Sequence, residues 1–142
     1  MRGRSPFLRF LYLALFWLSC ISQAQAGNVL IIANANVPKF DAKRAERLYT
    51  GKSTNVNGVL ITAVNMASGS DLRNRFLDTY LSQDNEKYEA YWTVRRYIGQ
   101  GTPPKEVSNP NEMINFIQNT PGAVGYIDES DLKPGLNVIL RP

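Results

Sequence analysis

The chain has 142 residues, with 16 Lys and Arg, 12 Asp and Glu, one cysteine and no histidine. The lack of histidine excludes Ser-His-Asp and Cys-His nucleophile systems and the usual zinc sites. We therefore predict a protein that is not an enzyme and that has no cofactor and no metal. A carboxylate-based hydrolase built from distant residues is the one enzyme class left open. Three of the basic residues stand in the first nine positions, within a segment that we expect to be removed. The net charge of +4 therefore does not indicate a nucleic-acid partner.

The first 26 residues have the pattern of a cleavable signal peptide. Arginines precede and enter an apolar run over residues 7–18, and Ala24-Gln25-Ala26 is a small-x-small cleavage site. The apolar run is shorter than the about 20 residues that span a bilayer, so an uncleaved anchor is the weaker alternative, and we predict no stable membrane insertion. Cys20 falls in the discarded segment. We predict cleavage near Ala26, one domain over residues 27–142, and a periplasmic or otherwise secreted location.

Apolar runs predict strands at residues 28–33, 59–64, 123–127 and 137–140. The runs are continuous rather than alternating, which is typical of strands covered on both faces, as in a parallel sheet.

Apolar residues at helical spacing predict helices at residues 42–49, 72–81 and 88–98, and a short helix that begins at Asn109 or Asn111. Asp41 is a suitable cap for the first helix, and Gly51 a suitable stop. The alternation of strands and helices predicts an α/β fold, with a small, mostly parallel sheet flanked by helices.

Residues 65–73 leave a predicted strand and enter a predicted helix, a place where α/β proteins collect ligands on free N–H groups. Ser68, Gly69 and Ser70 offer two hydroxyls and a close approach to the backbone. Arg73 stands where a capping box would have Glu or Gln, at the helix end that disfavours cations. One interpretation is an anion held by Ser68, Ser70 and Arg73. The other is that Ser70 only caps the helix and Arg73 is solvated.

Four separated motifs resemble, in the same order, the substrate-binding proteins of phosphate ABC transporters. They are residues 48–52, residues 59–64 leading into 68–70, Tyr91-Trp92, and residues 121–126. The resemblance covers nearly all of residues 27–142, but only about half of the family's usual two-lobed protein. It implies a single lobe of a type 2 periplasmic binding protein.

The resemblance also implies a ligand, phosphate or a similar small anion, at Ser68, Gly69 and Ser70. Asn65 stands near the place of the family's phosphate-pairing arginine, and Ser70 replaces a threonine. Arg73 is then a substitute cation supplied from the helix. The predicted anion site consists of Asn65, Ser68, Gly69, Ser70 and Arg73.

A single lobe leaves one side of a bound anion in water, so the other side would come from an ABC permease, another envelope protein or a self-dimer. The sequence thus predicts an exported solute-binding-like protein connected with ABC-type phosphate uptake. The alternative is a periplasmic protein-interaction or accessory module that keeps the lobe fold without binding a ligand.

Overall fold

The computed structural model describes residues 27–142, so the predicted signal peptide and Cys20 lie outside the described residues. The strands are β1 (Val29–Ala33), β2 (Asn55–Val56), β3 (Val59–Leu60), β4 (Thr62–Met66), β5 (Lys105–Val107), β6 (Ala123–Asp128) and β7 (Asn137–Leu140). The helices are α1 (Ala42–Tyr49), α2 (Asp71–Phe76), α3 (Asn85–Tyr97) and α4 (Pro110–Asn119). A π-helical turn, η1 (Leu77–Leu81), continues α2, and a 3-10 turn, η2 (Glu129–Asp131), follows β6.

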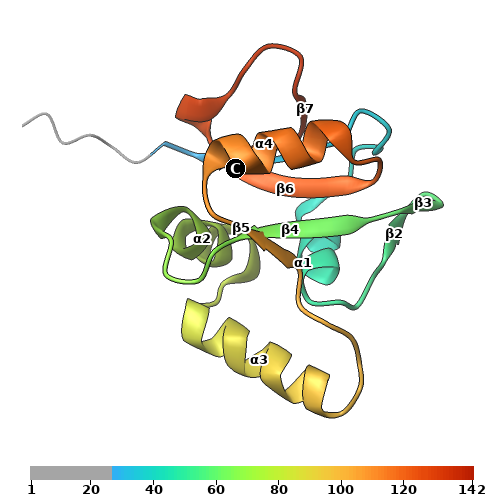
Figure 1. The fold of residues 1–142 in the computed structure, drawn as a ribbon, viewed down its shortest axis with the longest axis vertical. Helices are drawn as coiled ribbons and strands as arrows, with labels where there is room; N and C mark the ends of the chain where they lie inside the picture. Colours follow the sequence, from blue (N-terminus) through green and yellow to red (C-terminus); the bar gives the residue numbers. More distant parts are fainter. Residues whose placement is uncertain (1–26) are drawn as a thin grey trace, which may run out of the picture.

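Five strands form one sheet in the order β5-β4-β6-β1-β7 (Figure 1). β4 pairs in parallel with β5 and β6, whereas β1 pairs antiparallel with β6 and β7. Four strands therefore run in one direction and only β1 is reversed, which confirms the predicted α/β class with a mostly parallel sheet. All five residues of β1 are buried, because helices cover both faces of the sheet, so its continuous apolar run indicated burial rather than strand direction.

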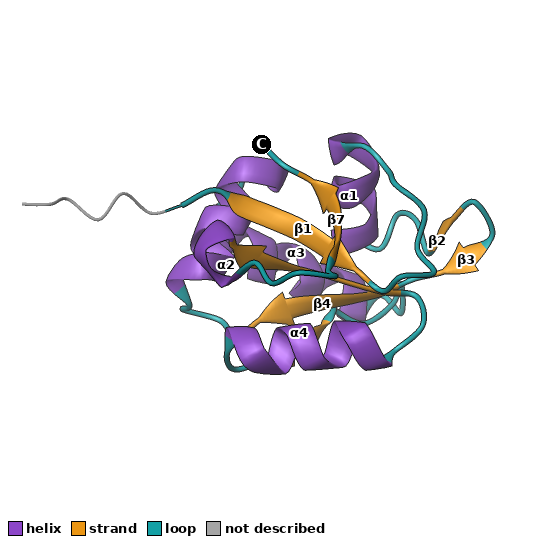
Figure 2. Cartoon of the chain, turned by 90° about the horizontal axis from the view of Figure 1, so that it is seen from above, coloured by secondary structure: helices purple, strands orange, loops and turns teal. Residues whose placement is uncertain are grey.

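Adjacent residues of β6 show which helices cover the two faces of the sheet. A Cβ atom at Gly125 would clash with the sulfur of Met113 in α4. The next side chain, Tyr126, points to the opposite face, where its ring stacks on Phe76 of α2 with a centroid distance of 3.9 Å and lies 6.1 Å from Tyr49 of α1. Since successive side chains of a strand alternate between faces, α4 covers one face, and α1 and α2 cover the other (Figure 2).

The predicted helix starts are confirmed at two places by their capping bonds. Asp41 accepts a hydrogen bond from the backbone N–H of Arg44 at 2.8 Å, and Asn109 accepts one from Glu112 at 2.8 Å. Asn109, not Asn111, therefore begins α4. None of the helices within residues 27–142 combines the length and the apolar character that spanning a bilayer requires.

The single strand predicted at residues 59–64 is wrong. Asn57 and Gly58 have φ angles of 47° and 85°, which form a tight hairpin turn, so β3 folds back on β2. From Thr62 the chain pairs with β6 instead, and β4 continues to Met66. Asn65 therefore belongs to a strand and not to the loop. β5 was not predicted, because this short edge strand buries only one of its three residues.

Two of the motifs behind the family resemblance are in contact with each other. Trp92 Nε1 donates to the carbonyl of Tyr49 at 3.3 Å, and the Tyr91 hydroxyl donates to the carbonyl of Thr50 at 2.7 Å. Gly51 has φ +70°, and a Cβ atom there would lie 2.7 Å from the Trp92 ring. These motifs fasten α3 to the end of α1, and this attachment positions α3 beside β4 and β5.

Candidate functional site

The predicted loop joins the end of β4 to the start of α2. Ala67 N–H donates to the carbonyl of Val107 in β5 at 2.9 Å, and Ser70 N–H donates to the carbonyl of Ala67 at 3.1 Å. Gly69 has φ +86°, with open space where a Cβ atom would stand. The Ser70 hydroxyl accepts a hydrogen bond from the backbone N–H of Arg73 at 3.4 Å. Ser70 therefore caps α2, as one of the two interpretations of the sequence proposed.

Ser68 is exposed, and its side chain is bonded to α3. Its hydroxyl donates to Oε1 of Glu89 and accepts from Nδ2 of Asn85 at 2.9 Å. The bond from Ser68 is the main reason that the pKa of Glu89 lies below its usual value, and Asn85 and Arg73 act in the same direction against the effect of desolvation. The Ser68 hydroxyl therefore already donates its hydrogen bond to a carboxylate oxygen of the protein itself.

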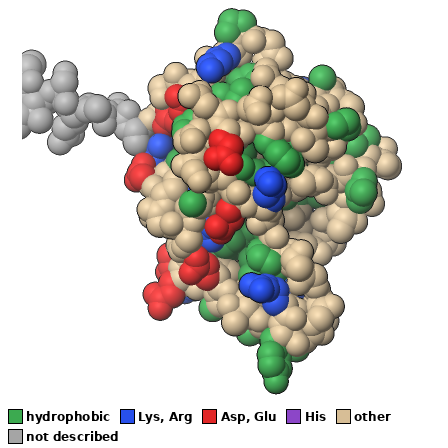
Figure 3. All heavy atoms as spheres, viewed as in Figure 1, with side chains coloured by type: hydrophobic (Ala, Val, Ile, Leu, Met, Phe, Trp, Pro, Cys, Tyr) green, Lys and Arg blue, Asp and Glu red, His purple; other side chains and the backbone are tan. Residues whose placement is uncertain are grey.

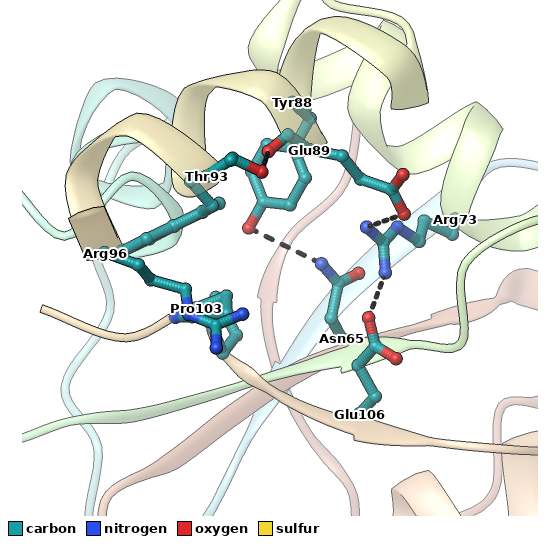
Figure 4. A pocket seen from close by; sticks show the side chains of 10 residues that line it. Asn65, Arg73, Tyr88, Glu89, Thr93, Arg96, Pro103 and Glu106 are labelled. Carbon is teal, nitrogen blue, oxygen red and sulfur yellow. Dashed lines mark hydrogen bonds and ion pairs between the residues drawn. The ribbon is translucent and has the colours of Figure 1, made fainter.

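Arg73 is buried, with 2% of its surface exposed, so the interpretation of Arg73 as a solvated side chain is wrong. Its Nη1 atom donates to the carbonyl of Met66 at 3.0 Å and to Oε1 of Glu106 at 2.6 Å, while Nη2 lies 3.6 Å from Oε1 of Glu89 (Figure 4). Nε is buried and has no hydrogen-bond partner among residues 27–142. The guanidinium is thus fixed between two carboxylates, and its buried Nε–H is left without a partner among the described residues.

Asn65 lies beside Arg73 and is 1% exposed. Its Oδ1 atom accepts from the hydroxyl of Tyr126, and its Nδ2 atom donates to the hydroxyl of Tyr88 at 3.5 Å. The guanidinium carbon of Arg73 lies 5.4 Å from the centre of the Tyr88 ring. Burial raises the pKa of Tyr88 to about 12, so its hydroxyl is neutral at ordinary pH. Asn65 and Tyr88 are thus hydrogen-bonded, uncharged polar side chains beside the Arg73 guanidinium.

These side chains line a pocket of about 230 Å³ between α3 and the sheet. The pocket is lined by Asn65, Arg73, Tyr88, Glu89, Trp92, Thr93, Arg96, Pro103, Pro104 and Glu106. Of the five predicted site residues, it includes Asn65 and Arg73, whereas Ser68, Gly69 and Ser70 lie just outside its lining. Two arginines and two glutamates balance in charge. No group of three or more His, Cys, Asp or Glu side chains suited to a metal occurs within the described range.

Sequence reasoning did not identify Glu89, Glu106 or Arg96 as site residues. Glu89 and Arg96 come from α3 and Glu106 from β5, and each reaches Arg73 or the pocket only through the tertiary fold. The only local signal was the misplaced cation at Arg73, where a capping box would have Glu or Gln.

No protein-family model matches the sequence, and a search of curated proteins gives no match. Solved structures with the same fold include an ABC-type phosphate transport receptor from Vibrio cholerae, with a TM-score of 0.55 and 17% sequence identity over 80% of this chain and 46% of that chain. Another is a putative phosphate ABC transporter substrate-binding protein with bound phosphate from Clostridium perfringens, with a TM-score of 0.54 and 19% identity over 80% of this chain and 45% of that chain.

The chain spans less than half the length of these two proteins. The expected resemblance is thus confirmed at the level of fold: residues 27–142 have the fold of one lobe of a phosphate ABC transporter substrate-binding protein.

Proposed function

We propose that the chain is an exported solute-binding-like protein that binds phosphate or a similar small anion in connection with ABC-type phosphate uptake. Export rests on the signal-peptide pattern of residues 1–26, with cleavage near Ala26 and release into the periplasm. The shared fold supports a binding role, since one of the similar proteins holds phosphate. The anion site is argued from the residues around Arg73.

The observation that carries the proposal is the position of the Glu89 carboxylate. Its Oε1 atom bonds to the Ser68 hydroxyl and lies 3.6 Å from Nη2 of Arg73. This oxygen stands in for an oxygen of the proposed ligand, because it occupies the point where the predicted loop and the predicted cation converge. The site accepts an anionic oxygen already, although the oxygen belongs to the protein.

Exchange of this carboxylate for a ligand follows from the difference in burial between the partners. The side chains of Glu89 and Glu106 are 49% and 50% exposed, whereas the Arg73 side chain is 3% exposed. The carboxylate of either glutamate can therefore turn into water, but Arg73 cannot follow it, and the buried charge that loses a partner favours an incoming anion. When Glu89 leaves, both the Ser68 hydroxyl and Nη2 of Arg73 become available to an anion, and the unused Nε lies on the same guanidinium.

The same competition limits the affinity of the site. A phosphate must displace a carboxylate and approach another one at Glu106, and a single lobe leaves its outer side in water. We expect weak binding by the isolated chain, and tighter binding when one of the competing carboxylates is neutralised. Arg96, exposed on the pocket wall, adds a second cation on the open side.

Isothermal titration of the chain over residues 27–142 with phosphate, and with sulfate for comparison, tests the proposal. Arg73→Met should abolish binding and Ser68→Ala should weaken it. Glu89→Gln should strengthen binding about tenfold, equivalent to about 1.4 kcal/mol. Glu86→Gln, a matched change at an exposed glutamate of the same helix, should have no effect. If neither the unmodified chain nor Glu89→Gln binds phosphate while folded, the anion proposal is wrong.

The second candidate function is a periplasmic interaction or accessory module that keeps the lobe fold without a ligand. It is favoured by the balanced charges of the pocket and by large apolar side chains on the outer side of α3, where Val94 is 60% and Tyr97 is 91% exposed. Its partner would be an ABC permease, another envelope protein or a second copy. A chain that binds no anion in any of the variants above, but associates with a protein, would establish this second function.

A further inference from the structure

The pocket beside Arg73 has more room than a phosphate ion fills. Its volume is about 230 Å³, whereas the five heavy atoms of phosphate take the space of roughly two to three water molecules, about 60–90 Å³. Trp92, Pro103 and Pro104 give part of its wall an apolar surface. Such a wall suits the carbon atoms of a ligand better than the oxygens of a free ion. A ligand that fills the pocket thus has a short carbon chain attached to its anionic group.

The charges that line the pocket are balanced before any anion enters. Arg73 and Arg96 are its cations, and Glu89 and Glu106 are its anions. A phosphate monoester adds about 1.5 to 2 negative charges at pH 7, and no further Lys or Arg among residues 27–142 lines the pocket to offset them. Figure 3 likewise shows acidic and basic side chains interspersed, without a basic patch on that face. An anion alone would therefore leave an excess of negative charge.

The carboxylate that an anion displaces also loses its cation. Oε1 of Glu89 lies 3.6 Å from Nη2 of Arg73, so an anion that takes this place separates the two side chains. Glu106 lies on the same guanidinium, with its Oε1 atom 2.6 Å from Nη1 (Figure 4). Two carboxylates then stand beside the bound anion. A cation placed next to all three would reduce the repulsion between them.

The position of the two carboxylates limits how far this cation can lie from the anionic group. Glu89 and Glu106 both contact the guanidinium that receives the anion, so the cation must follow the anionic group within a few bonds. The surroundings favour a primary ammonium group, because carboxylates accept hydrogen bonds from N–H. A quaternary ammonium group binds to the faces of aromatic rings, and Tyr88 and Trp92 are only 1% and 5% exposed.

We propose that the ligand of this pocket is a small phosphorylated primary amine with a two-carbon linker, whose phosphate binds Ser68 and Arg73 and whose ammonium group binds Glu89 and Glu106. This inference rests on the proposed function and names the substrate class of the same anion site. The ligand is the free monoester, because it offers three unsubstituted phosphate oxygens to Ser68 and Arg73, whereas the same amine in a phospholipid headgroup offers two. Its own cation offsets the negative charge that limits the affinity for plain phosphate.

Isothermal titration of the chain over residues 27–142 with O-phosphoethanolamine and with n-propyl phosphate tests the proposal. The two esters have the same number of heavy atoms and differ only in an ammonium group that replaces a methyl group. We expect phosphoethanolamine to bind at least tenfold more tightly than n-propyl phosphate. Phosphocholine, whose amine is quaternary, should lose this advantage. Equal or weaker binding of phosphoethanolamine would overturn the proposal, even if phosphate itself binds.

Glu106→Gln should act differently on the two esters. Loss of this carboxylate should strengthen the binding of n-propyl phosphate, since one repulsion is removed, but not that of phosphoethanolamine, which also loses an acceptor. The ratio of the two dissociation constants should therefore fall towards one, and Glu89→Gln should have the same effect. Glu86→Gln, at an exposed position of α3 outside the pocket lining, should leave the ratio unchanged. A ratio that remains tenfold in both pocket variants would contradict the assignment of the ammonium group.

Two further probes separate the other outcomes. Vesicles that contain phosphatidylethanolamine present the same amine as a lipid headgroup. Co-sedimentation of the chain with these vesicles, without binding of free phosphoethanolamine, would overturn the assignment to the free monoester. Titration with inorganic phosphate reports on the proposed function by itself. If phosphate binds but the amine gives no advantage, only the amine proposal is wrong. If neither phosphate nor either ester binds, the anion site is wrong as well.

Discussion

The aromatic core and the pocket between α3 and the sheet both contact β4, but they differ in how completely their polar groups are hydrogen-bonded. In the core, the hydroxyl of Tyr49 donates to the carbonyl of Val64 at 2.8 Å, and the rings of Phe76 and Tyr126 stack at 3.9 Å. In the pocket, Arg73 keeps an unpartnered Nε, and its two carboxylate partners are about half exposed. The polar groups of the core therefore keep their partners, whereas Arg73 in the pocket can exchange a carboxylate partner for a ligand.

This difference separates residues that stabilise the fold from residues that can serve a ligand. Fully paired buried groups contribute to stability and leave nothing for a ligand to bond. Incompletely paired charges contribute less to stability and can change partner. Asn65 connects the two regions, since it bonds to Tyr126 on the core side and to Tyr88 on the pocket side. Substitutions in each region should therefore affect different measurements.

The largest effect is expected from Phe76→Ala in the core. Phe76 is fully buried, between Tyr49 and Tyr126, so its removal leaves a cavity and should lower the free energy of unfolding by about 3–5 kcal/mol. Urea unfolding followed by circular dichroism measures this loss. Tyr97→Ala removes an aromatic ring that is 91% exposed and should change stability by less than about 0.5 kcal/mol in dilute solution. Similar losses for both variants would contradict the contrast between core and surface.

Tyr126→Phe should cost about 1–3 kcal/mol of unfolding free energy, because it leaves two buried groups without partners. These are the backbone N–H of Met66, which donates to the Tyr126 hydroxyl at 3.0 Å, and Oδ1 of Asn65. Tyr91→Phe removes one bond at a partly buried hydroxyl and should cost less. The same urea experiment compares the two variants. A larger loss for Tyr91→Phe would show that the bond to Asn65 is not important for stability.

Alkaline pH should destabilise the fold through its buried tyrosines. Burial raises the pKa of Tyr80 and of Tyr88 to about 12, compared with about 10 in the unfolded chain. The neutral form is therefore favoured by folding. This stabilisation is fully present below about pH 10 and is lost as the pH rises towards about 12. Melting temperature and tyrosinate absorbance, measured together, should change in the same range. Complete ionisation of all tyrosines near pH 10 in a chain that remains folded would contradict this expectation.

The smallest effect on stability is expected from Ser68→Ala in the pocket region. Ser68 is exposed, so the free energy of unfolding should change by less than about 0.5 kcal/mol. The pKa of Glu89 should nevertheless rise, because the bond from Ser68 is the main cause of its lowered value. NMR titration of the Glu89 carboxyl measures this shift, with Glu86 as an internal comparison. An unchanged pKa would mean that Ser68 does not bond to Glu89 in solution.

The family motifs were visible in the sequence because they are fixed by close packing. Gly122 has φ +78°, and a Cβ atom there would clash with the backbone carbonyl of Leu60. Because Gly125 has no side chain, α4 lies directly on β6, and because Gly51 has none, the Trp92 ring packs directly on the backbone after α1. These glycines and aromatic residues explain how the fold could be predicted. They say little about the ligand, since they act through packing rather than through the pocket.

The sequence by itself determined the α/β class, the main helices and their caps, and the place of the loop at residues 68–70. Each of these depends on neighbours along the chain: apolar periodicity, capping side chains and glycines in turns. Only the tertiary structure decided that Arg73 is buried and that Glu89 and Glu106 accompany it. Those carboxylates lie 16 and 33 residues further along the chain and come from α3 and β5, so no local pattern could pair them with Arg73. Only the tertiary structure likewise decided that α3 buries Tyr88 and Trp92 while it exposes Val94 and Tyr97.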